Sequence, residues 1–236
     1  MGLLSVILNK GFSWIDILSC LISCSIVVFL ILPVHEYAHG FVASKLGDPT
    51  ARYQGRLKLN PMAHIDYMGA LMIYLVGFGW AKPVPVNSRY FNNPKRDMAI
   101  TALAGPLSNI ICAFIAVFLS NLFVFIYYYA MNIAFFSVVL YILANIFTYV
   151  ALINLSLAFF NLIPIPPLDG SKILAAFLPD RIYYKLMQYE RYFMIFIMIL
   201  VFAGSGISNI LSRVSYGVFN VFGKITWLPF EFILGL

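Results

Sequence analysis

Two histidines and one glutamate near the start of the chain have a spacing that suits hydrolytic metal chemistry. The run from His35 to His39 reads H-E-x-x-H, and in a helix its two histidines lie one turn apart on one face. Two imidazoles so placed can hold one metal ion, typically zinc. Glu36 lies around the helix from both and can accept a proton from a water at the metal. The spacing therefore predicts a zinc site with its own general base.

The composition places these residues in or beside a lipid bilayer. Hydrophobic residues make up 62% of the chain and charged residues 10%, and the mean hydropathy is +0.92, which together predict an integral membrane protein. The net charge of +6 comes from basic residues in loops between apolar runs, so it argues against nucleic-acid binding. Cys20, Cys24 and Cys112 lie within apolar runs, where small packing residues are expected rather than disulfides.

The apolar runs predict an all-α polytopic membrane protein, with a core of three transmembrane helices and additional helices at the C-terminal end. Residues 17–34 form the first run, and residues 98–168 contain no Asp, Glu, Lys, Arg or His. Because one span takes about 20 residues, the second run predicts two helices joined by a hairpin at residues 127–132. Residues 192–212 predict a further span, and residues 214–236 either cross the membrane or lie at its surface.

Basic residues orient this bundle. They gather in three loops, after the first span, before the second and after the third: Lys45, Arg52, Arg56 and Lys58; Lys82, Arg89, Lys95 and Arg96; Lys172, Arg181, Lys185 and Arg191. The positive-inside rule makes these loops cytoplasmic. At helical rise the two histidines then lie about 9 to 15 Å below the loop that begins at Lys45. Ionisable groups at such a depth are costly and usually functional, whereas a helix end emerging into water would leave both histidines merely solvated.

The zinc site needs a third protein ligand, because catalytic zinc sites use three and leave one position for water. The remaining candidates are His64 and the aspartates Asp16, Asp48, Asp66, Asp97, Asp169 and Asp180. Asp169 ends a stretch whose three prolines interrupt the third span, which permits irregular backbone at membrane depth. Counting crossings places it in the same leaflet as His35, whereas Asp48, Asp66 and Asp97 belong to basic loops that can pair them with Arg or Lys. The topology therefore favours Asp169.

Residues 68–80 are apolar but too short to cross, and basic loops flank them on both sides. Both features predict a re-entrant element rather than a span. Gly69, Gly77 and Gly79, interspersed with β-branched and aromatic residues, favour a bent, β-like strand over a helix. We expect the exposed edge of residues 71–80, with Gly77, Phe78 and Gly79, to bind an unwound substrate as an added strand.

Several motifs together resemble the site-2 protease family of intramembrane zinc metalloproteases. The pattern Asn161-x-x-Pro164-x-x-x-x-Asp169-Gly170 pairs with the H-E-x-x-H run, and residues 60–66, 77–87 and 104–109 support the likeness, which covers roughly residues 33–180. The loops are too short for the peptide-binding PDZ insertion or the nucleotide-sensing domain of larger members. The chain resembles the compact branch, and we expect residues 1–236 to form a single membrane-embedded domain.

The resemblance implies a role for each site residue. His35, His39 and Asp169 would bind one Zn²⁺, Glu36 would be the general base and acid, and Asn161 would contact the substrate near the scissile carbonyl. It implies an intramembrane endopeptidase that cuts within or near the transmembrane segment of a membrane protein, in regulated intramembrane proteolysis. The partners would be that substrate, the lipid bilayer and a regulatory membrane protein. The location would be the cell membrane, with the active site towards the cytoplasmic leaflet.

Other functions stay open from the sequence alone. A polytopic transporter or metal-binding scaffold could use the same histidines for a passing or structural ion, and an inactive homologue could act as a binding partner. Glu36 separates these from a protease, because only hydrolysis needs the base. His64 and Asp66 either line a path for water or substrate, or cap and hydrogen-bond the loop before residues 68–80, and we favour the structural role.

Overall fold

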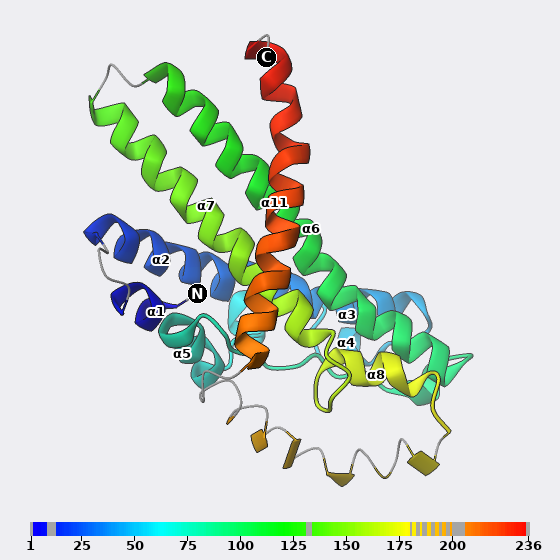
Figure 1. The fold of residues 1–236 in the computed structure, drawn as a ribbon. Coiled ribbons are helices and arrows are strands. Elements are labelled where there is room, and N and C mark those ends of the chain that lie inside the picture. The colour runs from blue at the N-terminus through cyan, green and yellow to red at the C-terminus, as the bar shows by residue number, and fades with distance from the viewer. Residues whose placement is uncertain are drawn as a thin grey trace.

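The computed structural model describes residues 2–8, 13–130, 134–179 and 206–234, with isolated positions between residues 181 and 199. Within this part of the chain all regular structure is helical and no strand forms (Figure 1). The elements are α1 (Leu3–Ile7), α2 (Trp14–Ile26), η1 (Val27–Ile31), α3 (Leu32–Lys45), α4 (Thr50–Tyr53), η2 (Pro61–Ala63), α5 (Tyr67–Val76), η3 (Ser88–Tyr90), α6 (Pro94–Ala130), α7 (Ala134–Asn161), α8 (Asp169–Ala175) and α11 (Gly206–Leu234). The all-α expectation is confirmed.

Three helices are long and apolar enough to cross a membrane, namely Trp14–Lys45, Pro94–Tyr129 and Phe135–Asn161. They correspond to the three spans expected from the sequence. The last two form an antiparallel pair, α6 and α7, which pack side by side (Figure 1). Ser120 of α6 donates to the Ala144 carbonyl of α7 at 3.0 Å, a contact of the kind that joins helices in lipid. The turn expected at residues 127–132 begins too early, because α6 continues to Ala130, and residues 131–133 fall outside the described residues.

The first span is one continuous helix made of α2, η1 and α3. Ser13 caps its start in a reciprocal capping box with Asp16, which satisfies free backbone N–H groups of the first turn. Near its middle, η1 is a widened π-type stretch that ends two residues before Pro33. Proline has no N–H to donate to the preceding turn, so a departure from regular α-helix is expected here. The helix then carries the H-E-x-x-H run into its last third.

The expected β-like strand at residues 68–80 is wrong, because most of this segment is helix α5. Asp66 caps the start of α5 by accepting from the Gly69 N–H at 2.8 Å, and Gly77 ends it with a left-handed φ of 76°. Only the following stretch, up to Asn87, is extended, and it makes one isolated bridge between Ile65 and Ala81. Residues 67–76 therefore form a short helix, and the residues that follow, up to Asn87, form an extended segment.

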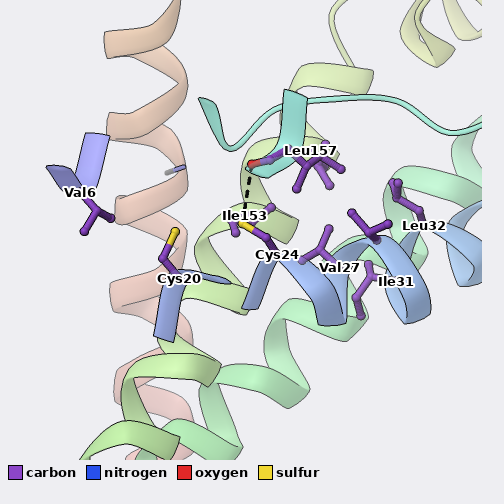
Figure 2. Close-up of a cluster of buried hydrophobic side chains, with 10 residues drawn as sticks. Val6, Cys20, Cys24, Val27, Ile31, Leu32, Ile153 and Leu157 are labelled. Atoms are coloured by element: carbon purple, nitrogen blue, oxygen red, sulfur yellow. Dashed lines mark hydrogen bonds between the residues drawn. The ribbon is translucent and has the colours of Figure 1, made fainter. Parts of the chain in front are cut away.

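A buried apolar cluster ties the first span to its neighbours. Figure 2 shows Cys24 and Val27 of the first span packed near Ile153 and Leu157 of α7. The Cys24 thiol also lies 3.6 Å from the Ile73 carbonyl of α5. All three cysteines are free, as the sequence predicted. The cluster fixes α5 and its extended continuation against the helix that carries the histidines.

The C-terminal end differs from the expected division into a span at residues 192–212 and a second segment at 214–236. A single helix, α11, covers Gly206–Leu234, while much of residues 192–205 lies outside the described residues. It packs along α6 and α7 (Figure 1), and the Asn121 amide of α6 donates to Gly223 O at 3.0 Å and to Thr226 Oγ1 at 2.8 Å. The described C-terminal helix therefore joins the bundle through polar contacts.

Candidate metal centre

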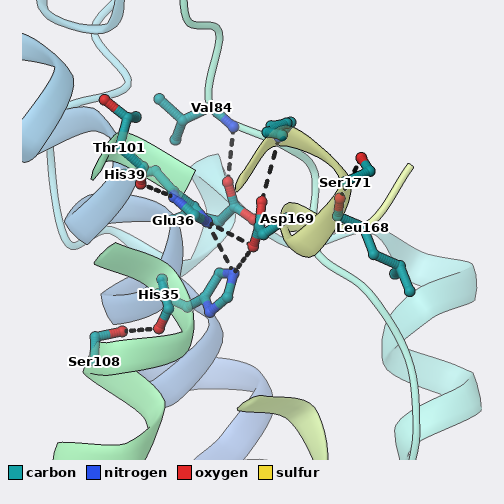
Figure 3. Close-up of polar contacts among 11 residues, drawn as sticks. His35, Glu36, His39, Val84, Thr101, Ser108, Leu168, Asp169 and Ser171 are labelled. Atoms are coloured by element: carbon teal, nitrogen blue, oxygen red, sulfur yellow. Dashed lines mark hydrogen bonds and ion pairs between the residues drawn. The ribbon is translucent and has the colours of Figure 1, made fainter. Parts of the chain in front are cut away.

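Three side chains from distant parts of the chain converge on one point. The Nε2 atoms of His35 and His39 lie 3.1 Å apart, and Asp169 Oδ2 lies 3.4 Å from the first and 3.1 Å from the second (Figure 3). All three residues are buried. The histidines come from α3, and Asp169 is the first residue of α8, just past the proline-rich turn. The three residues that the sequence favoured as ligands are thus brought together.

The spacing of these atoms fits a tetrahedral zinc ion. Zinc binds nitrogen and carboxylate oxygen at roughly 2.0 to 2.2 Å, so two ligand atoms of a tetrahedral site lie about 3.3 to 3.5 Å apart. The separations of 3.1, 3.1 and 3.4 Å reach this range or lie just below it. Within the described residues this is the one group of His, Cys, Asp or Glu side chains with metal-binding spacing. Two imidazoles and one carboxylate also leave a fourth position, as a catalytic site requires.

Thr101 sets the protonation of one imidazole. Its main-chain carbonyl lies 2.8 Å from His39 Nδ1, and a carbonyl can only accept, so Nδ1 carries the proton. The neutral ring then has its lone pair on Nε2, the atom that faces His35 and Asp169. This arrangement orients a metal-binding histidine and strengthens it as a ligand.

Gly105 lets α6 pass directly over the imidazole pair. A Cβ atom at this position would lie 2.6 Å from His35 Cε1 and closer still to His39 Nε2. No ordinary side chain fits there, because carbon atoms in contact stay about 3.5 Å apart or more. In the sequence, Gly105 stood out only as part of residues 104–109, which support the family likeness. Its neighbour in space turns out to be the metal centre itself.

Asp169 is placed by a tight turn and stabilised as a carboxylate. A Cβ on Gly170 would collide with the Leu162 carbonyl, so glycine allows the loop to fold back from the end of α7. Lys172 Nζ lies 3.3 Å from Asp169 Oδ1. Burial alone opposes ionisation of Asp169, but the two imidazoles and Lys172 hold the pKa of its carboxyl well below its usual range. Asp169 is therefore available as an anionic ligand.

Glu36 does not belong to the three-atom cluster. Its Oε2 accepts from the main-chain N–H of Val84 at 2.7 Å (Figure 3), on the extended segment after α5. Val84 stands between Pro83 and Pro85, neither of which has an N–H, so it is the one donor of this triplet. The contact holds a buried carboxylate beside the metal centre and leaves it free to exchange a proton.

A cavity of about 530 Å³ opens onto these groups. Asn161, Phe78 and Gly79 line it, together with the metal-site residues and Lys172. Gly77, which the sequence grouped with Phe78 and Gly79, is not among its lining residues and ends α5 instead. The extended segment contributes most of one wall, through residues 78–81, 83, 84 and 86.

His64 and Asp66 are structural, as the sequence analysis favoured. His64 is fully buried, and its Nε2 lies 2.7 Å from the Lys58 carbonyl, while Asp66 caps α5. Neither lines the cavity. Three functional positions escaped sequence reasoning: the Thr101 carbonyl, the Val84 N–H and the Lys172 ammonium. Of these three positions, only Val84 is marked in the sequence, because it lies between two prolines.

Comparison with known proteins adds to this geometry. Residues 23–205 match the family described as Peptidase family M50. The chain is 41% identical over 178 residues to the Bacillus subtilis (strain 168) protein named "Putative zinc metalloprotease YwhC", covering 75% of this chain and 78% of that one. It is 26% identical over 179 residues to "Putative zinc metalloprotease Rip2" of Mycolicibacterium smegmatis, covering 72% and 63% respectively. No solved structure matches the chain significantly.

Proposed function

Since the chain belongs to peptidase family M50, the site-2 protease family of zinc metalloproteases, we propose that it hydrolyses a peptide bond within or near the transmembrane segment of a membrane protein. The convergence of His35, His39 and Asp169 beside a separately held Glu36 carries this proposal. A scaffold or transporter site would need the ligands but not the base. The base occupies the same cavity as the ligands, which favours hydrolysis.

The residues divide the chemistry between them. His35, His39 and Asp169 would hold the ion, and zinc held there lowers the pKa of a water and polarises a carbonyl. Glu36 takes the proton from the attacking water and passes it to the nitrogen of the leaving amine. Asn161 lines the same cavity, where its amide can donate a hydrogen bond to the oxyanion or to the substrate backbone.

The substrate must lose part of its helix before it can be cut, because a helix hides its carbonyls in internal hydrogen bonds. The extended segment after α5 is the element that can receive the unwound stretch. Much of its far end is already engaged, since Lys82 N–H donates to His64 O, Val84 N–H to Glu36 and Asn87 N–H to Asp48. Ala81 is also paired, in the bridge to Ile65. Residues 78–80 are therefore the part that we propose for pairing with substrate.

The setting follows from the family and the three apolar helices, which make this a membrane protein with the bilayer as its surroundings. We further propose that the whole chain acts as one membrane-embedded unit in the cell membrane, with the metal centre towards the cytoplasmic leaflet. The basic loops next to the centre support this orientation, and the first of them begins at Lys45. Cleavage would then release the cytoplasmic part of a substrate, as in regulated intramembrane proteolysis.

Substitution of the base tests the function. Glu36→Gln keeps the shape and the hydrogen-bond acceptor for Val84 but cannot take a proton. We expect cleavage of a single-span substrate by purified protein to fall by at least about 100-fold, with zinc content close to one ion per chain. Membrane proteomics of cells carrying this variant should show an uncut single-span protein accumulating. Full activity of the variant would refute the proposed mechanism.

A further inference from the structure

The Nδ1 atoms of the two metal-binding imidazoles differ in their hydrogen bonding to the described residues. His39 Nδ1 has the Thr101 carbonyl at 2.8 Å, whereas His35 Nδ1 is buried with no hydrogen-bond partner among the described residues. If His35 Nε2 binds metal, Nδ1 must carry the proton, because a neutral imidazole has one N–H. A buried N–H without an acceptor costs about 1 to 3 kcal/mol. The Nδ1 atom of His35 therefore needs a hydrogen-bond acceptor that no contact among the described residues provides.

Asn109 is a buried asparagine on the helix that covers the imidazoles. Its side chain is 1% exposed, and both its amide oxygen and its amide nitrogen are without a partner among the described residues. An amide in that condition is costly, particularly in a membrane protein. Such a group in a well-packed interior calls for an explanation.

Helix geometry places Asn109 on the side of His35. Thr101, Gly105 and Asn109 follow each other at intervals of four along α6, so they share one face. Thr101 meets His39, and Gly105 lies against both imidazoles. The next turn of the same face therefore continues towards His35. Because Cα–Cβ bonds in a helix lean towards its N-terminus, the Cβ of Asn109 is directed towards the turn of Gly105, although no hydrogen bond joins its amide to His35 in this structure.

We propose that Asn109 is the positioning residue for His35, with its Oδ1 accepting the Nδ1 proton when the site is loaded with zinc. In this way α6 orients both ligands, through a main-chain carbonyl for His39 and a side-chain amide for His35. This proposal rests on the proposed function, because it assumes that His35 is a zinc ligand. Asn154 of α7 also has a buried, unpartnered oxygen, but its Nδ2 donates to Val150 of its own helix at 2.8 Å, and α7 does not carry the face over the imidazoles.

Zinc affinity, measured by competition with a chelator, tests the assignment without relying on activity. Asn109→Leu removes the acceptor at similar volume, and we expect it to weaken zinc binding by about 10- to 100-fold. Asn109→Asp keeps an acceptor oxygen and should stay within about threefold of the wild type. Asn154→Leu is the matched control on α7 and should also bind zinc normally. Thermal melting of each variant in detergent establishes that it is folded, and Asn109→Ala replaces the leucine variant if that one does not fold.

The outcomes separate this inference from the function on which it rests. His35→Ala should abolish tight zinc binding. If it does so while Asn109→Leu binds zinc as tightly as the wild type, the positioning role is wrong and the metal site stands. If Asn154→Leu weakens binding and Asn109→Leu does not, the acceptor lies on α7 and the assignment is overturned. If His35→Ala itself binds zinc normally, the ligand assignment fails, and the role of Asn109 fails with it.

Discussion

Four side chains and two main-chain groups of this protein account for its metal centre, and the sequence revealed only some of them. His35, Glu36 and His39 could be found because their spacing is a property of one helix. Asp169 could be found because its proline-rich neighbourhood breaks a span. The Thr101 carbonyl is a main-chain group that every residue type possesses, so no residue pattern marks it, and the Val84 N–H is marked only by the prolines on either side of it. Their roles depend on how α3 lies against α6 and the extended segment.

Gly105 gives a test at the residue scale. Gly105→Ala places a methyl group where the two imidazoles lie, so either the rings or α6 must move. We expect zinc binding to weaken by at least about tenfold, since displaced ligands lose their shared geometry, and cleavage to fall with it. Gly217→Ala on α11 is the matched control, because nothing lies within 4 Å of its added Cβ. Equal zinc affinity in the two variants would show that the close approach of α6 at Gly105 does not determine the position of the two imidazoles.

At the scale of elements, the misread segment at residues 68–80 shows which signals mattered. Its glycines and β-branched residues favoured a bent strand, but Asp66 is a good N-cap and Gly77 a good helix end. Those two signals bound the observed helix Tyr67–Val76. Gly69 and Gly79 serve a different purpose, since a Cβ on Gly69 would collide with Trp80 O. They let α5 and the extended segment cross closely, a contact that no local pattern could reveal.

The link between the extended segment and Glu36 can be cut by one substitution. Val84→Pro removes the N–H that donates to Glu36, while Val84→Ala keeps the N–H and shortens the side chain. A hydrogen bond to a charged group contributes about 1.5 to 3 kcal/mol, so the proline variant should lose about tenfold or more in kcat, with zinc content unchanged. The alanine variant should lose much less. Equal losses in the two variants would assign the effect to the side chain and not to the hydrogen bond.

The returning segment should also be where substrate binds. A photo-crosslinking residue at Phe78, which lines the cavity, should capture a single-span substrate in the Glu36→Gln background. The same probe at Leu71, an exposed position on α5, serves as the control and should capture less. Capture at Leu71 but not at Phe78 would place the substrate on the helix and contradict pairing with residues 78–80.

At the scale of the whole molecule, the three long apolar helices were predicted correctly, because the length of an apolar run can be counted directly in the sequence and compared with the thickness of a bilayer. The division of the C-terminal residues was not predictable in this way. The polar contacts of α11, such as Asn121 with Thr226, join positions far apart in sequence, and α11 continues without a break through residue 213, where the sequence suggested a division.

Metal binding should stabilise the molecule, because the site joins α3 to α8. A ligand that binds only the folded state at 100 times its Kd adds about 2.7 kcal/mol. Removing zinc with a chelator should therefore lower the Tm of the wild-type protein in detergent, and added zinc should restore it. His39→Ala is the control and should melt at the same temperature with and without chelator. A wild-type Tm that ignores the chelator would indicate that these helices are not joined through metal.

The most direct test of the metal centre is the zinc content of the detergent-purified protein and its variants. The wild type and Glu36→Gln should each hold one zinc ion per chain, because Glu36 lies outside the ligand set. His39→Ala and Asp169→Ala should hold almost none, since each removes one of three ligands that lie within 4.8 Å of one another. Wild-type protein without bound metal, or an Asp169→Ala variant that keeps a full zinc ion, would contradict the assignment of this centre.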